Sequence, residues 1–198
     1  MAKTKGWNLP TIKRRDFLRT ALIAGTAGGV GAFGAASLGF LWPNLGEGFG
    51  AQITVGSVDE LLSDIQSENA PFEYPAGRLY VVTWDPNIPG AEEAYGEDHV
   101  ITDGGVGLMA LYQKCVHLGC RVPWCQSSQW FECPCHGSKY NRLGEWTGGP
   151  APRGLDRFPS EIDDDGNFVA NTGIVVTGPA RTANVLQQEP EGPHCIDI

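Results

Sequence analysis

The stretch that decides this fold runs from Cys115 to Tyr140. It reads CVHLGC over residues 115–120 and, after an intervening loop, CPCHGSKY over residues 133–140. Five of the six cysteines and two of the four histidines fall in it, and the two boxes hold four of these cysteines and both histidines. Thiolates and imidazoles are ligands of zinc and of iron–sulfur clusters. The stretch therefore predicts a metal centre built by two loops, which the rest of the chain is expected to carry, cover or deliver.

The spacing of these groups bears on which metal they hold. The two halves read Cys115-x-His117 and Cys133-x-x-His136, with 15 residues between His117 and Cys133. Common zinc modules instead combine Cys-x2–4-Cys with His-x3–5-His. Two further cysteines at matching places in the loops would be surplus to one zinc ion. A 2Fe–2S centre, with two thiolates on one iron and two imidazoles on the other, accounts for the ligands; a structural zinc module is the alternative.

Together the two boxes resemble the Rieske iron–sulfur subunit of quinol–cytochrome c reductases, the cytochrome bc and bf complexes. The resemblance implies one Rieske-type 2Fe–2S cluster. It assigns Cys115 and Cys133 to the inner iron and His117 and His136 to the outer iron. It also implies that a free ring nitrogen accepts a proton from quinol, with His136 the first candidate and His117 the second.

The same resemblance implies roles for residues around the cluster. Ser138 and Tyr140 match hydroxyls that donate hydrogen bonds to cluster sulfur, which stabilises the reduced state. Leu118 is expected to cover the cluster near the quinol-docking face. Pro150 belongs to GGPAP, residues 148–152, which resembles the Pro loop that forms a lid over the cluster.

The remaining cysteines predict crosslinks. The resemblance implies a disulfide between Cys120 and Cys135 that joins the two loops. Cys125 and Cys195 are left over, and in an oxidising compartment they suggest a second disulfide that pins the C-terminus to the cluster-binding subdomain; two free thiols are the alternative reading.

The N-terminal part predicts export and membrane anchoring. Residues 1–19 are basic and contain the adjacent pair Arg14-Arg15, which resembles a twin-arginine signal, and residues 20–42 carry no charge. Such a run is long enough to cross a bilayer, and its basic flank stays on the cytoplasmic side. We expect an uncleaved single-pass anchor with the later domain outside; a cleaved export signal is the alternative. Residues 43–52, which include three alternating glycines, are expected to form a hinge.

The later residues predict an all-β domain over 53–178 and a polar tail over 179–198. A capping box at Ser57–Glu60 predicts a helix over about 58–66. His99 and His194 are expected at the surface. The expected strands are 78–84, 106–114, 129–132, 158–162, 167–171 and 173–178, with loops over 69–77 and 85–98. We expect a Rieske-type antiparallel β-sandwich with a cluster-binding subdomain inserted over about 112–154.

Charge excludes one class of partner. Six of the 14 basic residues lie in the first 20 positions, so the rest of the chain holds 8 basic and 22 acidic residues. An acidic body repels phosphates, which argues against nucleic acid.

The expected function is the electron-transfer subunit of a membrane quinol–cytochrome c oxidoreductase, with a cytochrome b-type subunit, a c-type cytochrome and quinol as partners. The Rieske small subunit of a molybdenum oxidase, such as arsenite oxidase, is the alternative.

Overall fold

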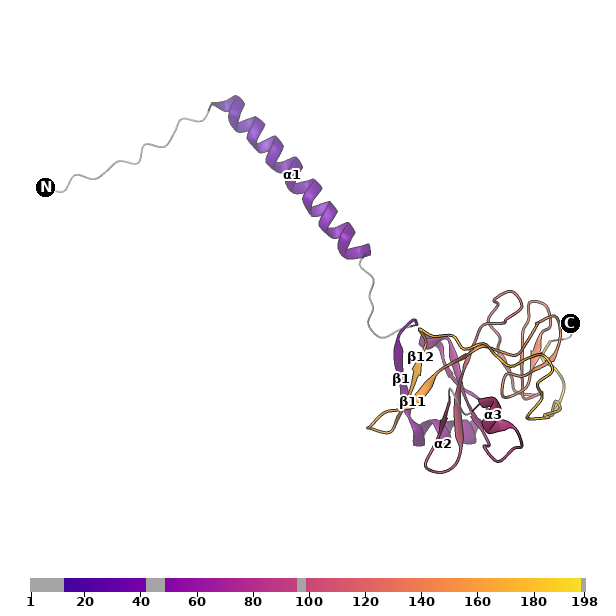
Figure 1. The fold of residues 1–198 in the computed structure, drawn as a ribbon. Coiled ribbons are helices and arrows are strands. Elements are labelled where there is room, and N and C mark those ends of the chain that lie inside the picture. Colours follow the sequence, from indigo (N-terminus) through magenta and orange to yellow (C-terminus); the bar gives the residue numbers. More distant parts are fainter. Residues whose placement is uncertain (1–12, 42–48, 96–98, 197–198) are drawn as a thin grey trace. The chain divides into compact units, whose positions relative to one another are not determined.

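A computed structural model describes residues 13–41, 49–95 and 99–196. Its contacts divide the chain into an N-terminal unit that holds helix α1 and a second unit that holds every strand of the described residues (Figure 1). Each unit is described separately.

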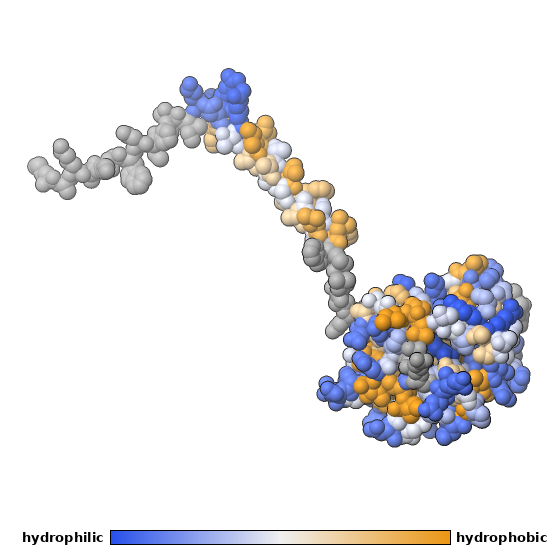
Figure 2. Space-filling model, viewed as in Figure 1, coloured by the Kyte–Doolittle hydropathy of each residue, from blue (hydrophilic) through white to orange (hydrophobic). Residues whose placement is uncertain are grey.

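The described residues of the N-terminal unit form one helix, α1 (Arg14–Leu41). It is long and apolar enough to cross a membrane, and none of its residues is buried. Figure 2 shows hydrophilic side chains at its start and mostly apolar ones beyond. The helix begins at Arg14, earlier than the predicted span, so the arginine pair occupies its first turn. The expected closing Trp42 lies outside the described residues.

Residues 49–52, predicted as part of the hinge, are bound to the second unit. The ring of Phe49 stacks on Tyr112 at 5.5 Å between centroids. The backbone N–H groups of Gly50 and Ala51 donate to the hydroxyl of Thr172 at 2.8 and 3.3 Å. The rest of the predicted hinge, with Gly46 and Gly48, lies outside the described residues.

The described residues of the second unit form three antiparallel sheets. Their order is β1-β12-β11, β10-β5-β3-β2 with β4 also on β5, and β6-β7-β8-β9. The elements are β1 (Gln52–Ser57), α2 (Val58–Glu68), β2 (Phe72–Tyr74), a 3-10 turn (Pro75–Gly77), β3 (Leu79–Trp84), α3 (Ala91–Tyr95), β4 (Val100–Ile101), β5 (Gly107–Tyr112), β6 (Trp124–Cys125), β7 (Trp130–Glu132), β8 (Lys139–Tyr140), β9 (Trp146–Gly148), β10 (Arg157–Phe158), β11 (Ser160–Ile162) and β12 (Asn167–Asn171).

The central pair β3 and β5 separates two hydrophobic cores. Because side chains alternate between the faces of a strand, Leu79 and Val81 enter one core with α2, whereas Tyr80 and Val82 enter the other with the cluster-binding sheet. Burial on both faces explains why these strands read as nearly continuous apolar runs. It also fixes the base of the two cluster loops in a packed interior.

The cluster-binding sheet β6–β9 is an insertion, as predicted. It lies in sequence between β5 and β10, and these two strands pair with each other, Phe158 opposite Ala110. Pro159 separates β10 from β11, so the predicted strand 158–162 is divided between two sheets. The predicted helix start is confirmed through its N-cap: the Ser57 hydroxyl accepts from the backbone N–H of Glu60 at the start of α2.

Four local predictions were wrong. Residues 69–77 and 85–98 were expected as loops but contain β2 and α3. The expected strand 173–178 forms only one bridge, between Val176 and Arg157. Just after this bridge, Gly178 packs so closely that a Cβ there would lie 2.1 Å from the carbonyl oxygen of Leu155. His99, expected at the surface, is buried.

Candidate metal centre

The first cluster loop follows β5 and closes on itself. The backbone N–H of Cys115 donates to the carbonyl of Cys120 at 2.7 Å, and the N–H of Gly119 donates to the carbonyl of Cys115 at 2.9 Å. Gly119 has φ of 90°, a left-handed conformation that glycine adopts at little cost. These hydrogen bonds close a short loop over residues 116–118.

The second loop follows β7 and repeats the same bonding pattern. The N–H of Cys133 donates to the carbonyl of Ser138 at 2.8 Å, and the N–H of Gly137 donates to the carbonyl of Cys133 at 3.0 Å. Gly137 has φ of 75°. The two loops are therefore matched turns, each starting at a cysteine, and a disulfide between Cys120 and Cys135 joins them.

The cysteines of this region divide into two classes. Cys115 and Cys133 are unbonded and buried. Sulfurs of Cys120, Cys133 and Cys135 lie within 4.8 Å of one another, but the first and last of these are bonded together and are not free to bind metal. The disulfide thus lies against the buried thiol of Cys133 and holds the loops together around it.

The two predicted histidines meet at the tip of the loops. The rings of His117 and His136 lie 4.9 Å apart, edge to face. His136 is exposed and His117 is half-buried. Leu118, beside them, is 71% exposed. An exposed leucine next to two accessible imidazoles makes an apolar surface with polar nitrogen atoms within it.

Two hydroxyl groups from the second loop and β8 lie beneath this tip. The Tyr140 hydroxyl is 3.3 Å from the Cys115 sulfur, and burial followed by the contact with Cys115 raises the pKa of the phenol. The phenol is therefore a stable hydrogen-bond donor. The Ser138 hydroxyl oxygen accepts from the backbone N–H of Ala151 at 3.2 Å, which leaves its own hydrogen available to another acceptor.

The predicted lid packs against the second loop through its backbone. A Cβ on Gly149, which has φ of 80°, would lie 2.3 Å from the carbonyl oxygen of Gly137. Only glycine allows this approach. Pro150 itself is exposed, so the tight contacts of the lid come from the residues on either side of it.

The donor set fits a Rieske-type cluster. Two buried sulfurs lie at the base of the site and two imidazoles lie at its surface, from loops of matched geometry. Burial, with the neighbouring Cys115 thiol also contributing, raises the pKa of Cys133. A pair of buried thiolates needs positive charge beside it, and the iron of a 2Fe–2S cluster supplies that charge. Cys115, Cys133, His117 and His136 are the residues that would hold it.

Two acidic residues of the cluster-binding subdomain were missed by sequence reasoning. Glu132 and Glu145 are fully buried and accept hydrogen bonds from the C-terminal segment, defined here as residues 181–196. The one available signal was the position of Glu132 within an otherwise apolar strand. The predicted Cys125–Cys195 pair, in contrast, is a disulfide in the structure.

Comparisons with known proteins agree with this geometry. The Rieske 2Fe–2S domain model matches residues 80–159. The chain is 34% identical over 167 residues to cytochrome b6-f complex iron–sulfur subunit 2 of Synechocystis sp., covering 83% of this chain and 87% of the relative. It is 33% identical over 165 residues to the cytochrome b6-f complex iron–sulfur subunit of Prochlorococcus marinus, covering 82% and 87%.

Solved structures with similar chains are also Rieske proteins or complexes. A hyperthermophilic respiratory Complex III chain is 27% identical with a TM-score of 0.39, over 74% of this chain and 94% of that one. A plasma membrane Rieske protein of Synechocystis is 25% identical with a TM-score of 0.39, over 60% and 98%. From the domain match and the two cytochrome b6-f relatives, the chain belongs to the Rieske 2Fe–2S family of iron–sulfur subunits.

Proposed function

We propose that this protein is the electron-transfer subunit of a membrane quinol–cytochrome c oxidoreductase. The observation that carries the proposal is the division of the donor set: two buried thiols hold the base of the site, and two imidazoles reach its surface beside exposed Leu118. The relatives named above are subunits of cytochrome b6-f complexes. Family membership and this surface together favour quinol as the electron donor.

The residues of the chain have separate tasks in this proposal. A bound 2Fe–2S cluster supplies one-electron redox chemistry at the two loops. His136, which is exposed, presents a ring nitrogen that accepts the proton of a quinol hydroxyl, and His117 is the second candidate. Leu118 gives the quinol ring an apolar contact. The Tyr140 hydroxyl, 3.3 Å from the Cys115 sulfur, stabilises the more negative reduced state and raises the potential.

The N-terminal unit is proposed as a single-pass anchor. Helix α1 has the length and composition of a membrane span, and its charged start favours a cytoplasmic N-terminus with the cluster domain on the outer side. Delivery of the electron to a c-type cytochrome requires the domain to move. Of the hinge expected over residues 43–52, Phe49–Gln52 are bound to the domain, and the rest lies outside the described residues.

The alternative, a small subunit of a molybdenum oxidase, has less support. The relatives reported above are named as cytochrome b6-f subunits, and a soluble oxidase subunit has no use for a helix of the length of α1. The proposed partners are therefore a cytochrome b-type subunit and a c-type cytochrome in the same complex.

The test is purification of the full-length protein from membranes, followed by EPR of the reduced sample and identification of the subunits that accompany it. We expect a Rieske signal together with b-type haem. Cys115→Ser should abolish the signal, whereas Leu118→Ala, which removes no ligand, should keep the signal and reduce quinol turnover through a higher KM. Bound zinc without an EPR signal, or a molybdenum subunit in the complex, would contradict the proposal.

A further inference from the structure

The C-terminal segment has no helix or strand in its described residues, yet it is held by a buried carboxylate beside the second cluster loop. Glu132, the last residue of β7, is 1% exposed. It accepts hydrogen bonds from the backbone N–H groups of Cys195 and Ile196 at 2.8 and 3.0 Å and from the hydroxyl of Ser128 at 2.6 Å. His194 Nδ1 lies 2.7 Å from it. The segment therefore supplies most of the partners of this carboxylate.

A second buried carboxylate holds the middle of the segment. Glu145, just before β9, is fully buried. It accepts from the backbone N–H groups of Val185 and Leu186 at 2.8 and 3.1 Å, from the side-chain amide of Asn141 at 2.6 Å, and from the hydroxyl of Tyr95. A buried charge is costly unless its hydrogen bonds are made. The segment thus supplies hydrogen bonds that two buried carboxylates need, and these carboxylates flank the second loop and the lid.

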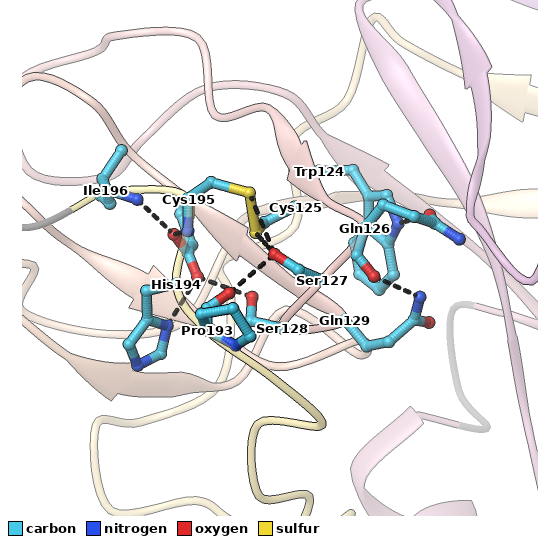
Figure 3. The surroundings of a disulfide bond; sticks show 11 residues. Trp124, Cys125, Gln126, Ser127, Ser128, Gln129, Pro193, His194, Cys195 and Ile196 are labelled. Carbon is cyan, nitrogen blue, oxygen red and sulfur yellow. Dashed lines mark hydrogen bonds and ion pairs between the residues drawn. A yellow bond between two sulfur atoms is a disulfide. The ribbon is translucent and has the colours of Figure 1, made fainter.

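A disulfide locks the end of the segment (Figure 3). Cys195 is bonded to Cys125 of β6, across 70 residues of sequence. Next to this bond the Ser127 hydroxyl donates to the carbonyl of Pro193 at 2.7 Å. The end of the chain is therefore attached covalently to the sheet that carries the second loop.

The start of the segment contacts the lid directly. The guanidinium of Arg181 lies over the ring of Trp146, 3.9 Å from its centroid, and donates to the carbonyl of Gly149 at 3.2 Å. The indole N–H of Trp146 donates to the same carbonyl at 3.2 Å. Gly149 in turn packs against the backbone of Gly137, the residue after His136. A continuous chain of contacts thus runs from Arg181 to the second cluster loop.

We propose that the C-terminal segment is a positioning element for the second cluster loop, and that Arg181 is the positioning residue through which it fixes the lid at Gly149. The segment lies beyond the part of the chain that matches the Rieske domain model, residues 80–159. The proposal rests on the proposed function, because it takes the second loop to hold the cluster through His136.

The test compares Arg181→Ala, Arg181→Lys and the control Arg78→Ala in the full-length protein. Arg78 stacks over Phe49, so its replacement removes one positive charge from a different contact. Three quantities are measured: the EPR line shape, the midpoint potential at low and high salt, and the rate at which a chelator bleaches the visible band of the cluster.

We expect Arg181→Ala to shift the line shape and the potential at both salt concentrations and to speed bleaching about fivefold, because one charge-assisted hydrogen bond and one cation–π contact are lost. Arg181→Lys, which keeps the charge and a donor for Gly149, should restore most of the original behaviour. Arg78→Ala should leave all three quantities unchanged. If the unmodified protein shows a Rieske signal and Arg181→Ala matches it in every measurement, the positioning role is wrong and the proposed function stands. If the unmodified protein shows no such signal, the proposed function itself is wrong.

Discussion

Replacement of Cys125 and Cys195 together by serine should lower the free energy of unfolding substantially. A disulfide stabilises mainly by restricting the unfolded chain, and the effect grows with the logarithm of the loop it closes. For a sequence separation of 70 the chain-entropy expression gives about 4.4 kcal/mol, against about 3.0 kcal/mol for the separation of 15 between Cys120 and Cys135. The bond at the chain end is therefore expected to contribute more than the bond at the cluster.

The assay is denaturant unfolding of the full-length protein in detergent, followed in parallel by circular dichroism and by the visible absorption of the cluster. The double serine variant should lose about 4.4 kcal/mol, or roughly 9–18 °C in Tm for a chain of this size. Ser127→Ala is the control, since it keeps the disulfide and removes the hydroxyl that donates to Pro193 and contacts the sulfurs of Cys125 and Cys195. Its expected loss is about 1 kcal/mol.

A loss below about 1 kcal/mol for the double variant would refute this reasoning. That result would mean that the unfolded chain already keeps its C-terminus near the cluster-binding sheet, so that the disulfide removes little disorder. If the double variant and the reduced unmodified protein both melted at the Tm of the oxidised unmodified protein, the conclusion would be the same.

Three further outcomes are expected. Tyr140→Phe removes the hydroxyl that lies 3.3 Å from a proposed ligand sulfur, and redox titration should show a midpoint about 40–60 mV lower, since about 1–1.4 kcal/mol of preference for the reduced state is lost. Gly149→Ala places a Cβ 2.3 Å from a carbonyl of the second loop, whereas Gly166→Ala has the same φ of 80° and open space; the first should cost at least about 2 kcal/mol more in denaturant unfolding, and equal losses would contradict the close approach. Burial lowers the pKa of His99 to about 3 from its ordinary 6.5. Below pH 6.5 this imidazole therefore becomes protonated in the unfolded state but stays neutral in the folded state. The free energy of unfolding should then fall by about 2.3 kcal/mol between pH 6.5 and 4.5, and the His99→Gln variant should not show this part of the fall.

The sequence by itself determined those elements that depend on interactions between residues close together in the chain. The capping box at Ser57 predicted the start of α2 because the serine side chain and its partner lie within one turn. The apolar runs of β3 and β5 predicted buried strands. The two cysteine–histidine boxes indicated the centre because each loop is closed by hydrogen bonds within six consecutive residues.

The tertiary structure decided everything that depends on residues far apart in sequence. Residues 173–178 have the composition of a strand, but Gly178 packs against Leu155 and a ladder does not form. Glu132 and Glu145 looked like ordinary acidic residues; they are buried because backbone N–H groups some 40 to 64 positions later satisfy them. Local pattern carries no record of such partners, so the role of the C-terminal segment became visible only once the chain was folded onto the loops that begin at Cys115 and Cys133.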